Sequence, residues 1–202
     1  MNQAIVLVVA YLLGSIPFAY LAGRLNGVDL RTVGSGNLGA TNVFRTLGRT
    51  VGIVVMVLDI AKGAAAVLIA QWVVGGAWWP IAAGALAILG HVFPVWTGFK
   101  GGKGVAVGAG ALIGLVPLAS AVLIVLWVLL VVVTRYVSVA SIVAALAAAP
   151  LAWLFGAPWP YVAFIALAAL FVIVKHRENI TRLLNGTENR IHLGGKGTPD
   201  PT

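Results

Sequence analysis

The feature that most constrains this chain is a series of long apolar runs separated by short polar connections. Residues 4–23, 51–74 and 105–134 each reach the length of about 20 residues that a helix needs to cross the hydrocarbon core of a bilayer. Hydrophobic residues make up 61% of the chain and charged residues only 9%. Such a composition cannot cover a water-exposed surface, since soluble domains carry about 25% charged residues. The sequence therefore predicts an all-α, polytopic membrane protein.

The apolar runs are consistent with about seven transmembrane helices, or with five if residues 137–154 lie flat or pack without spanning. The stretch from residue 105 to residue 134 is too long for one untilted span, so we expect a hairpin there. The expected helices cover residues 4–23 with a kink at Pro17, 51–74 after an N-cap at Thr50, 79–89, the two arms of 105–134 around 114–117, 137–154 and 159–174.

The basic residues predict the side of the membrane on which each connection lies. Of the 13 lysines and arginines, only Lys62 lies within an apolar run, and the others lie in residues 24–49, 100–103, 135 and 175–196. With seven crossings these connections share one side, which the positive-inside rule makes cytoplasmic. The N-terminus is then outside and the C-terminus cytoplasmic. We expect one membrane domain over residues 1–193 and a flexible tail over residues 194–202.

Composition also excludes several classes of function. Cysteine is absent, and the three histidines lack the spacing of paired ligands, so no metal and no cofactor are expected. The net charge of +8, without an extended soluble basic face, favours an anionic surface or substrate and argues against nucleic acid as a partner.

Asp59 and Lys62 lie three residues apart inside an apolar run, where we expect them to pair with each other. Lys62 could also add charge to a neighbouring anion site.

The glycine-rich stretch from Gly90 to Gly104 carries the strongest functional signal. Glycines let a ligand approach the main chain closely, and successive N–H groups can form a concave anion site. Lys100 and Lys103 add positive charge, and the helix that follows directs its positive dipole end to the same place. The stretch therefore predicts a phosphate site, with close helix packing as the alternative explanation of the glycines. A lone histidine such as His91 is more often a structural group than a catalytic one.

A second polar cluster, residues 34–48, falls on the same predicted side of the membrane. Ser35, Asn37, Thr41 and Asn42 offer neutral hydrogen-bonding groups among several glycines. Arg45 can form a bidentate contact with a phosphate, which a lysine cannot. The alternative is a glycine-rich turn whose arginine reaches toward lipid headgroups.

The third polar cluster follows the last apolar run. His176, Asn179 and Arg182 recur every three residues and so share a helix face. Glu178 and Arg182 have the spacing of an ion pair, and Gly186 is a suitable C-cap. The alternative for this segment is a basic helix that lies on anionic lipid.

In these clusters the chain resembles the bacterial acyl-phosphate:glycerol-3-phosphate acyltransferases, the PlsY family. The matching pieces are residues 35–45 with Gly48, 90–94 with 98–104, and 176–184 with Gly186 and Glu188. The resemblance implies transfer of a fatty acyl group from acyl phosphate to the 1-hydroxyl of sn-glycerol 3-phosphate, which gives lysophosphatidic acid and phosphate in the first step of phospholipid biosynthesis. It also implies a bacterial plasma membrane location, an active site on the cytoplasmic face and no metal.

The resemblance further implies roles for individual residues. The 101–104 segment would bind glycerol 3-phosphate, Ser35 and Arg45 would polarise the acyl phosphate, and His176 and Asn179 would orient the attacking hydroxyl. The general base is either His176 or a phosphate oxygen of the donor. The residues expected in catalysis are Ser35, Arg45, Lys103, His176 and Asn179, and those expected to bind substrate are Gly36, Asn37, Thr41, Asn42, His91, Lys100, Gly101, Gly102, Gly104, Arg182 and Glu188.

Two other classes of function fit the same features less well. A transporter or scramblase for an anionic lipid or phosphate metabolite would use the basic pocket as a conduit, but the sequence has no clear internal repeat. A non-catalytic lipid-binding scaffold would not need three separate clusters of polar side chains. A soluble partner could supply the acyl phosphate, and the lipid bilayer is the remaining expected partner.

Overall fold

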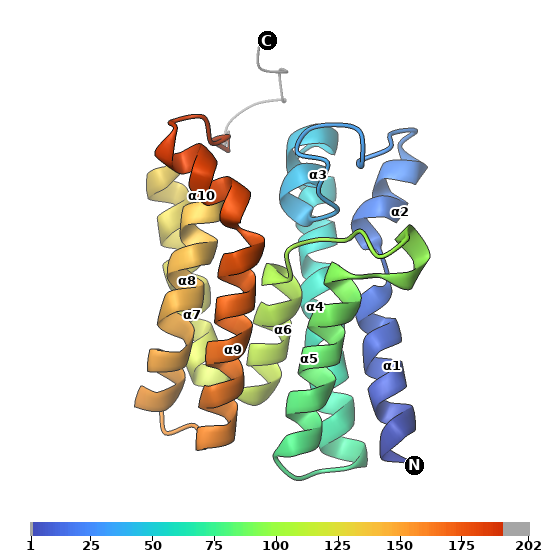
Figure 1. Cartoon of the computed structure of the whole chain (residues 1–202), viewed down its shortest axis with the longest axis vertical. Helices are drawn as coiled ribbons and strands as arrows, with labels where there is room; N and C mark the ends of the chain where they lie inside the picture. Colours follow the sequence, from blue (N-terminus) through green and yellow to red (C-terminus); the bar gives the residue numbers. More distant parts are fainter. Residues whose placement is uncertain (1, 192–202) are drawn as a thin grey trace.

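The computed structural model describes residues 2–191, and over this range every regular element is a helix. The long helices stand side by side along one direction (Figure 1). The elements are α1 (Gln3–Ser15), α2 (Phe18–Leu25), α3 (Ala40–Leu47), α4 (Arg49–Val73), α5 (Trp78–Val92), the 3-10 turn η1 (Val95–Thr97), α6 (Val105–Leu115), α7 (Pro117–Thr134), α8 (Val137–Leu154), α9 (Trp159–Lys175) and α10 (Arg177–Leu184).

Five segments of the described chain are long and apolar enough to cross a membrane: α1 with α2, α4, α5 with η1, α7 and α8. The pair α9 and α10, bent by 55°, makes a sixth if it is counted as one span. The all-helical, polytopic architecture predicted from the sequence is confirmed. The seventh predicted crossing corresponds to α6, which is apolar but has only 11 residues, about 16 Å at the helical rise.

The hairpin predicted within residues 105–134 turns at Val116, where the backbone leaves the helical region. Pro117 then occupies the first turn of α7, a position where its missing N–H group is not needed. The short arm, α6, approaches α4 closely. A Cβ atom added at Gly110 would collide with the carbonyl oxygen of Ile60. Small residues at such positions let two transmembrane helices pack with their backbones close together.

Three local predictions need correction. The first apolar run is not merely kinked at Pro17 but divided there into α1 and α2. The N-cap of α4 is Gly48, with φ +94°, and not Thr50. The polar connection before α4 contains a helix, α3, that was not predicted because its amphipathic run is only eight residues long. Helix α3 packs closely on α4 at Gly52, because a Cβ atom at that position would collide with the backbone of Phe44.

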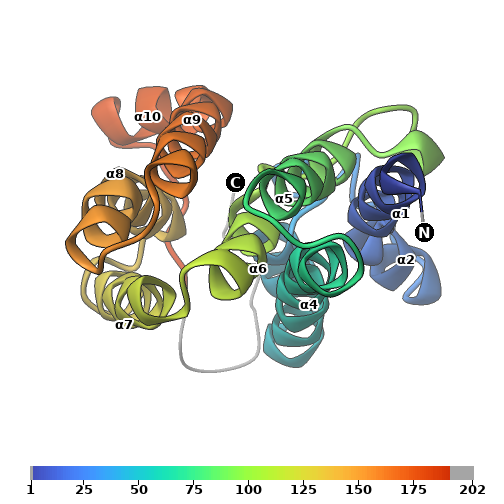
Figure 2. The same cartoon turned by 90° about the horizontal axis from the view of Figure 1, so that it is seen from below.

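The helices form two groups with α6 between them (Figure 2). One group contains α7, α8 and α9, and the other contains α1, α4 and α5. Two apolar cores correspond to these groups, and α6 contributes to both: Ala111 and Leu115 to the first core, and Val107 to the second. The start of α6, immediately after Lys103, therefore lies where the two groups meet.

The polar connections gather at one end of the molecule. The loop before α3, the loop between α5 and α6, and α10 all lie in the upper half of the molecule in Figure 1. The connections α4–α5, α6–α7 and α8–α9 lie at the opposite end. This arrangement matches the predicted one-sidedness of the basic segments. Which end faces the cell interior stays a prediction, and the predicted tail, residues 194–202, lies outside the described residues.

Candidate active site

A cleft of about 310 Å³ opens at the end where the polar connections meet. Its walls come from residues 35–37, residues 92–93, residues 99–103 and the junction of α9 with α10. Phe93 and Phe99 add apolar surface to an otherwise polar wall. The charged residues that line the cleft are Lys100, Lys103, Lys175, Arg177, Arg182 and Glu178. Five basic groups against one acidic group produce a positive field that favours an anionic ligand.

The glycines of the 98–104 loop have two physical functions. Gly98 and Gly104 lie at φ +64° and +86°, in the left-handed region that other residues adopt only with strain. Gly101 and Gly102 instead allow a close approach, since a Cβ atom on either would collide with His91. The backbone N–H group of Gly102 also donates to the carbonyl oxygen of His91, at 3.2 Å. Both glycines therefore pack against α5 on one side and line the cleft on the other.

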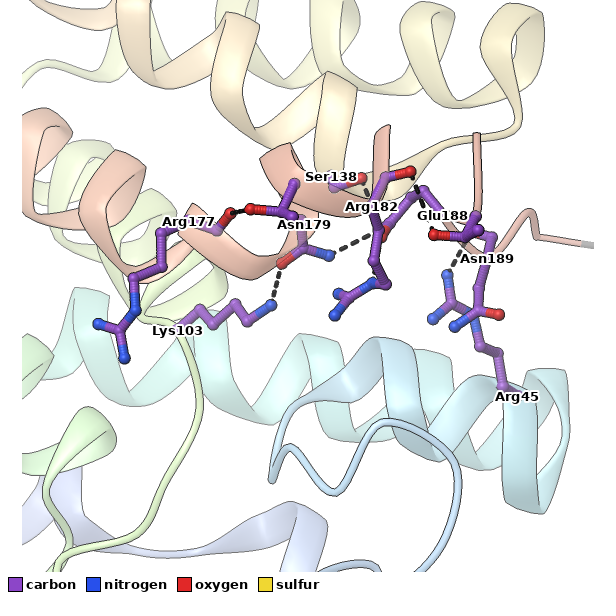
Figure 3. Close-up of polar contacts among 10 residues, drawn as sticks. Arg45, Lys103, Ser138, Arg177, Asn179, Arg182, Glu188 and Asn189 are labelled. Carbon is purple, nitrogen blue, oxygen red and sulfur yellow. Dashed lines mark hydrogen bonds and ion pairs between the residues drawn. The ribbon is translucent and has the colours of Figure 1, made fainter. Parts of the chain in front are cut away.

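Lys103 is held in the cleft by a chain of hydrogen bonds (Figure 3). Its Nζ donates to Oδ1 of Asn179, and Nδ2 of Asn179 donates to Oε1 of Glu188 at 2.7 Å. Glu188 also accepts from Ser138 Oγ at 2.8 Å and from Arg182 Nε at 2.7 Å. Three donors on one buried carboxylate hold it firmly. Glu188 thereby turns the amide of Asn179 so that its oxygen faces Lys103.

The charges of this network are tuned by burial and by their partners. Burial alone would raise the pKa of Glu188, but the hydrogen bonds from Asn179, Ser138 and Arg182 bring it below its ordinary value. Burial lowers the pKa of Lys103, and the positive charge of Arg182 lowers it further. Burial also lowers the pKa of Arg45, although an arginine stays charged because its ordinary pKa exceeds 12. The cleft thus contains a lysine whose charge is poorly solvated, which strengthens its attraction for an anion.

The predicted ion pair between Glu178 and Arg182 is wrong. Arg182 pairs instead with Glu188, at 2.7 Å between Nε and Oε2. A buried carboxylate depends on a partner far more than an exposed one does, and Glu178 is exposed. The C-cap of α10 is Asn185, one residue before the predicted Gly186, which follows in the left-handed conformation.

The second polar cluster, residues 34–48, contains cleft residues and a residue that braces them. Ser35 and Asn37 line the cleft. Asn42 is buried behind them, where its Nδ2 donates to the carbonyl oxygens of Leu30 and Val33, each at 3.2 Å. Its Oδ1 accepts from the backbone N–H group of Ser35 at 3.0 Å. The amide of Asn42 is therefore occupied in holding the turn that presents Ser35.

Arg45 and His176 lie near the same end but do not line the cleft. Nη2 of Arg45 donates to the carbonyl oxygen of Asn189 at 2.8 Å, while its buried Nε has no hydrogen bond within the described residues. His176 is buried, with Nδ1 at 2.8 Å from the carbonyl oxygen of Val172. Because a carbonyl only accepts, Nδ1 is the protonated nitrogen when the imidazole is neutral.

The candidate residues therefore fall into three groups. The residues that line the cleft are Ser35, Gly36, Asn37, Lys100, Gly101, Gly102, Lys103 and Arg182. The residues that hydrogen bonds or close packing place behind the cleft wall are Asn42, His91, Gly104, Asn179 and Glu188. The residues that lie away from the cleft wall are Thr41, Arg45 and His176.

Several residues of the cleft and of the hydrogen-bond network behind it were not identified from the sequence. Ser138 lies in an apolar helix, where a serine usually bonds its own backbone, so no local signal marked it. Phe93 and Phe99 lie inside the glycine-rich stretch but carry no polar chemistry. Lys175 and Arg177 flank His176, and only the fold shows that they reach the cleft.

These features define a class: a polytopic membrane protein with an anion-binding cleft at one end of its helices. A sequence model of the glycerol-3-phosphate acyltransferase family matches residues 4–186, and the chain belongs to this family. It is 49% identical over 191 residues to the glycerol-3-phosphate acyltransferase of Geobacter sulfurreducens, with 94% of this chain and 98% of the relative covered. It is 50% identical to glycerol-3-phosphate acyltransferase 2 of Moorella thermoacetica, covering 92% and 95% of the two chains.

Crystal structures extend this similarity to three dimensions. The fold matches that of PlsY, an integral membrane glycerol 3-phosphate acyltransferase, in its glycerol 3-phosphate form with a TM-score of 0.91 and 41% identity. The match to the lysophosphatidic acid form has a TM-score of 0.88 and 39% identity, and each covers 95% of this chain and 96% of PlsY. The family and the acyltransferase class predicted from the sequence are confirmed, and the transporter alternative has no support.

Proposed function

We propose that this chain transfers a fatty acyl group from acyl phosphate to the 1-hydroxyl of glycerol 3-phosphate, producing lysophosphatidic acid and inorganic phosphate. The observation that carries the proposal is the cleft, in which five basic side chains and a glycine-rich backbone lie at the end of apolar helices. Both substrates carry a phosphate, and one carries a lipid chain. A basic site beside the bilayer suits this pair of ligands.

The two anions occupy opposite walls of the cleft in this proposal. Gly101, Gly102 and Lys103 bind the phosphate of glycerol 3-phosphate through backbone N–H groups and the ammonium group. Ser35 and Asn37, on the other wall, contact the acyl phosphate. Arg45 is a candidate partner of the same phosphate, since its Nε is unpaired within the described residues. Asn179 and Glu188 position Lys103 and do not themselves need to touch a substrate.

The reaction needs position and charge more than a strong base. The 1-hydroxyl oxygen attacks the acyl carbon, an ester bond forms, and the bond from that carbon to the phosphate oxygen breaks. Acyl phosphate is already activated, so most of the rate arises from holding two anions together and stabilising the oxyanion. Asn37 and nearby backbone N–H groups are the oxyanion candidates. No cofactor is required.

A phosphate oxygen of the donor is the general base that we propose. His176 lies outside the cleft wall, so its unprotonated Nε2 is not placed beside the attacking hydroxyl. We expect His176→Ala to lower kcat but to leave the shape of the pH–rate profile unchanged. Loss of the acidic limb of that profile in the variant would instead assign the base to His176.

We further propose that the cleft faces the cytoplasm of a bacterial cell from the plasma membrane. The support is the gathering of the basic connections at the cleft end of the helices. Residues 1–193 would then form one catalytic domain. A soluble partner that hands over acyl phosphate would have to approach from this end.

The assay that tests the function uses the purified protein in lipid nanodiscs with a fatty acyl phosphate and glycerol 3-phosphate. We expect phosphate release that depends on both substrates, lysophosphatidic acid as the lipid product, and little reaction with acyl-CoA. Ser35→Ala, Arg45→Ala and Lys103→Ala should each lower kcat/KM by about 10²–10³. Phosphate release without added glycerol 3-phosphate, or equal use of acyl-CoA, would contradict the proposal.

A further inference from the structure

A charged cluster lies inside the bundle, beneath the glycine-rich loop. Asp59 and Lys62 on α4 are 1% and 5% exposed, and their side chains pair at 2.7 Å between Oδ1 and Nζ. The pair predicted from their spacing is therefore present. Asp59 is ten residues into α4, roughly 15 Å from the start of the helix. Charges at such depth are costly and are found where they have a function or a specific partner.

Lys62 connects three helices through one ammonium group. Besides Asp59, its Nζ contacts the carbonyl oxygen of Ile16 at 2.8 Å and Nδ1 of His91 at 3.1 Å. The carbonyl of Ile16 lies at the break between α1 and α2, where Pro17 interrupts the helical hydrogen bonds. The ammonium group of Lys62 thus has two hydrogen-bonding partners, besides the ion pair with Asp59. The cluster therefore joins the α1–α2 break to α4 and α5.

The contact with Lys62 also determines the tautomer of His91. An ammonium group only donates, so Nδ1 accepts and the ring proton lies on Nε2. Nε2 faces Gly102, where an added Cβ atom would collide with it. Asp59, His91 and Gly101 further share a void of about 10 Å³, so nothing larger than one water separates cluster and loop.

We propose that the cluster of Asp59, Lys62 and His91 positions the phosphate-binding loop for glycerol 3-phosphate. The imidazole of His91 supports Gly102, and the backbone carbonyl of His91 lies against Gly101. Lys62 and Asp59 hold the imidazole in one orientation. These three are positioning residues, since none of them lines the cleft wall with Lys103. The inference rests on the proposed function of that cleft, and it assigns the sequence-predicted role of His91 to the backbone that it supports.

The test removes both charges together, because one alone would leave an unpaired charge in the bundle. In the double variant Asp59→Asn/Lys62→Met we expect the KM for glycerol 3-phosphate to rise about 10- to 100-fold. The KM for acyl phosphate should stay within twofold of the wild type. The matched control is Gln71→Leu, which removes a partly buried hydrogen bond from α4 to the carbonyl oxygen of Gly114 at the opposite end of the helices.

A second pair of variants leaves the ion pair intact. His91→Leu removes the acceptor for Lys62, whereas the side-chain oxygen of Asn in His91→Asn can replace Nδ1. We expect His91→Leu to raise the KM for glycerol 3-phosphate and His91→Asn to restore most of the wild-type value. Melting temperatures in detergent, measured for each variant and for Gln71→Leu, separate positioning from loss of fold.

The outcomes distinguish the inference from the function on which it rests. An inactive wild-type protein would overturn the proposed function. If the wild type is active but the double variant keeps the wild-type KM for glycerol 3-phosphate, the inference alone is overturned. Equal KM values for glycerol 3-phosphate in His91→Leu and His91→Asn would also overturn it. So would KM values for both substrates that change only in step with the melting temperature.

Discussion

At the scale of single residues, Lys103 depends on side chains that a ligand need not touch. Asn179 receives its hydrogen bond, Glu188 orients Asn179, and Ser138 and Arg182 hold Glu188 in place. These partners come from α8, α10 and the segment after α10. The position of one lysine is therefore set by residues from three regions of the chain.

The lowered pKa of Lys103 predicts how substrate binding depends on pH. Burial shifts the loss of its proton to a pH below that of an ordinary lysine. As the pH rises through that value, the cleft loses a positive charge, so the KM for glycerol 3-phosphate should increase. Lys103→Arg retains its charge at high pH and should move this increase to higher pH, whatever its effect on kcat. KM measured across the alkaline range tests this, and identical profiles would contradict it.

Ser138 provides a test of the network behind the cleft. Ser138→Ala removes one of the three donors to Glu188 and should destabilise the fold by about 1.5–3 kcal/mol, as expected for a hydrogen bond to a charged group. The matched control is Ser120→Ala, also buried, whose hydroxyl bonds only the carbonyl oxygen of Val116 in the preceding turn. Thermal unfolding in detergent compares the two variants. An equal change in both would show that Glu188 does not need Ser138.

At the scale of helices, α6 shows why a short apolar segment can be essential to the fold. It contributes to both cores, and its first residue follows the loop that carries Lys103. Its contact with α4 depends on the absence of a side chain at Gly110. A shift of α6 would therefore also move Lys103, which lines the cleft.

Two glycines of α6 give a matched pair of variants. Gly110→Ala would place a methyl group against the backbone of α4 and should destabilise the protein by about 1–3 kcal/mol. Gly108→Ala meets only the end of the Ile88 side chain, at 3.9 Å. It should be neutral or stabilising by about 0.5–1 kcal/mol, because alanine suits a helix better. Melting temperatures and activity of both variants test the packing, and the reverse order would refute it.

At the scale of the whole molecule, the helices bring segments far apart in sequence to one end. Residues 35–37 and residues 100–103 line the same cleft with Arg177 and Arg182. The opposite end contains the start of α1 and the short turns between apolar helices (Figure 1). This division is what allows the positive-inside rule to predict the orientation of the protein.

The orientation can be tested directly because the chain has no cysteine. Single cysteines at Thr50 and Asn185 would mark the cleft end, and single cysteines at Asn2 and Ala157 the opposite end. In intact cells a membrane-impermeant maleimide should label only the second pair. Labelling of the first pair should require permeabilised cells. The opposite pattern would place the cleft outside the cell.

The sequence by itself determined the membrane class, most helix boundaries and the three polar motifs. The α8 helix covers residues 137–154, as predicted, because an apolar run bounded by polar or glycine- and proline-containing segments defines a span without tertiary contacts. The pairing of Asp59 with Lys62 was likewise predictable, since their spacing places both on one helix face.

Only the tertiary structure decided which polar residues meet. Arg182 pairs with Glu188 and not with the nearer candidate Glu178. The support that His91 gives to the glycine-rich loop and the contact of Ser138 with Glu188 join residues that are distant in sequence. Local spacing ranks partners by proximity along one helix. Burial changes that ranking, because a charge or polar group removed from solvent must be satisfied by whatever the folded chain brings beside it.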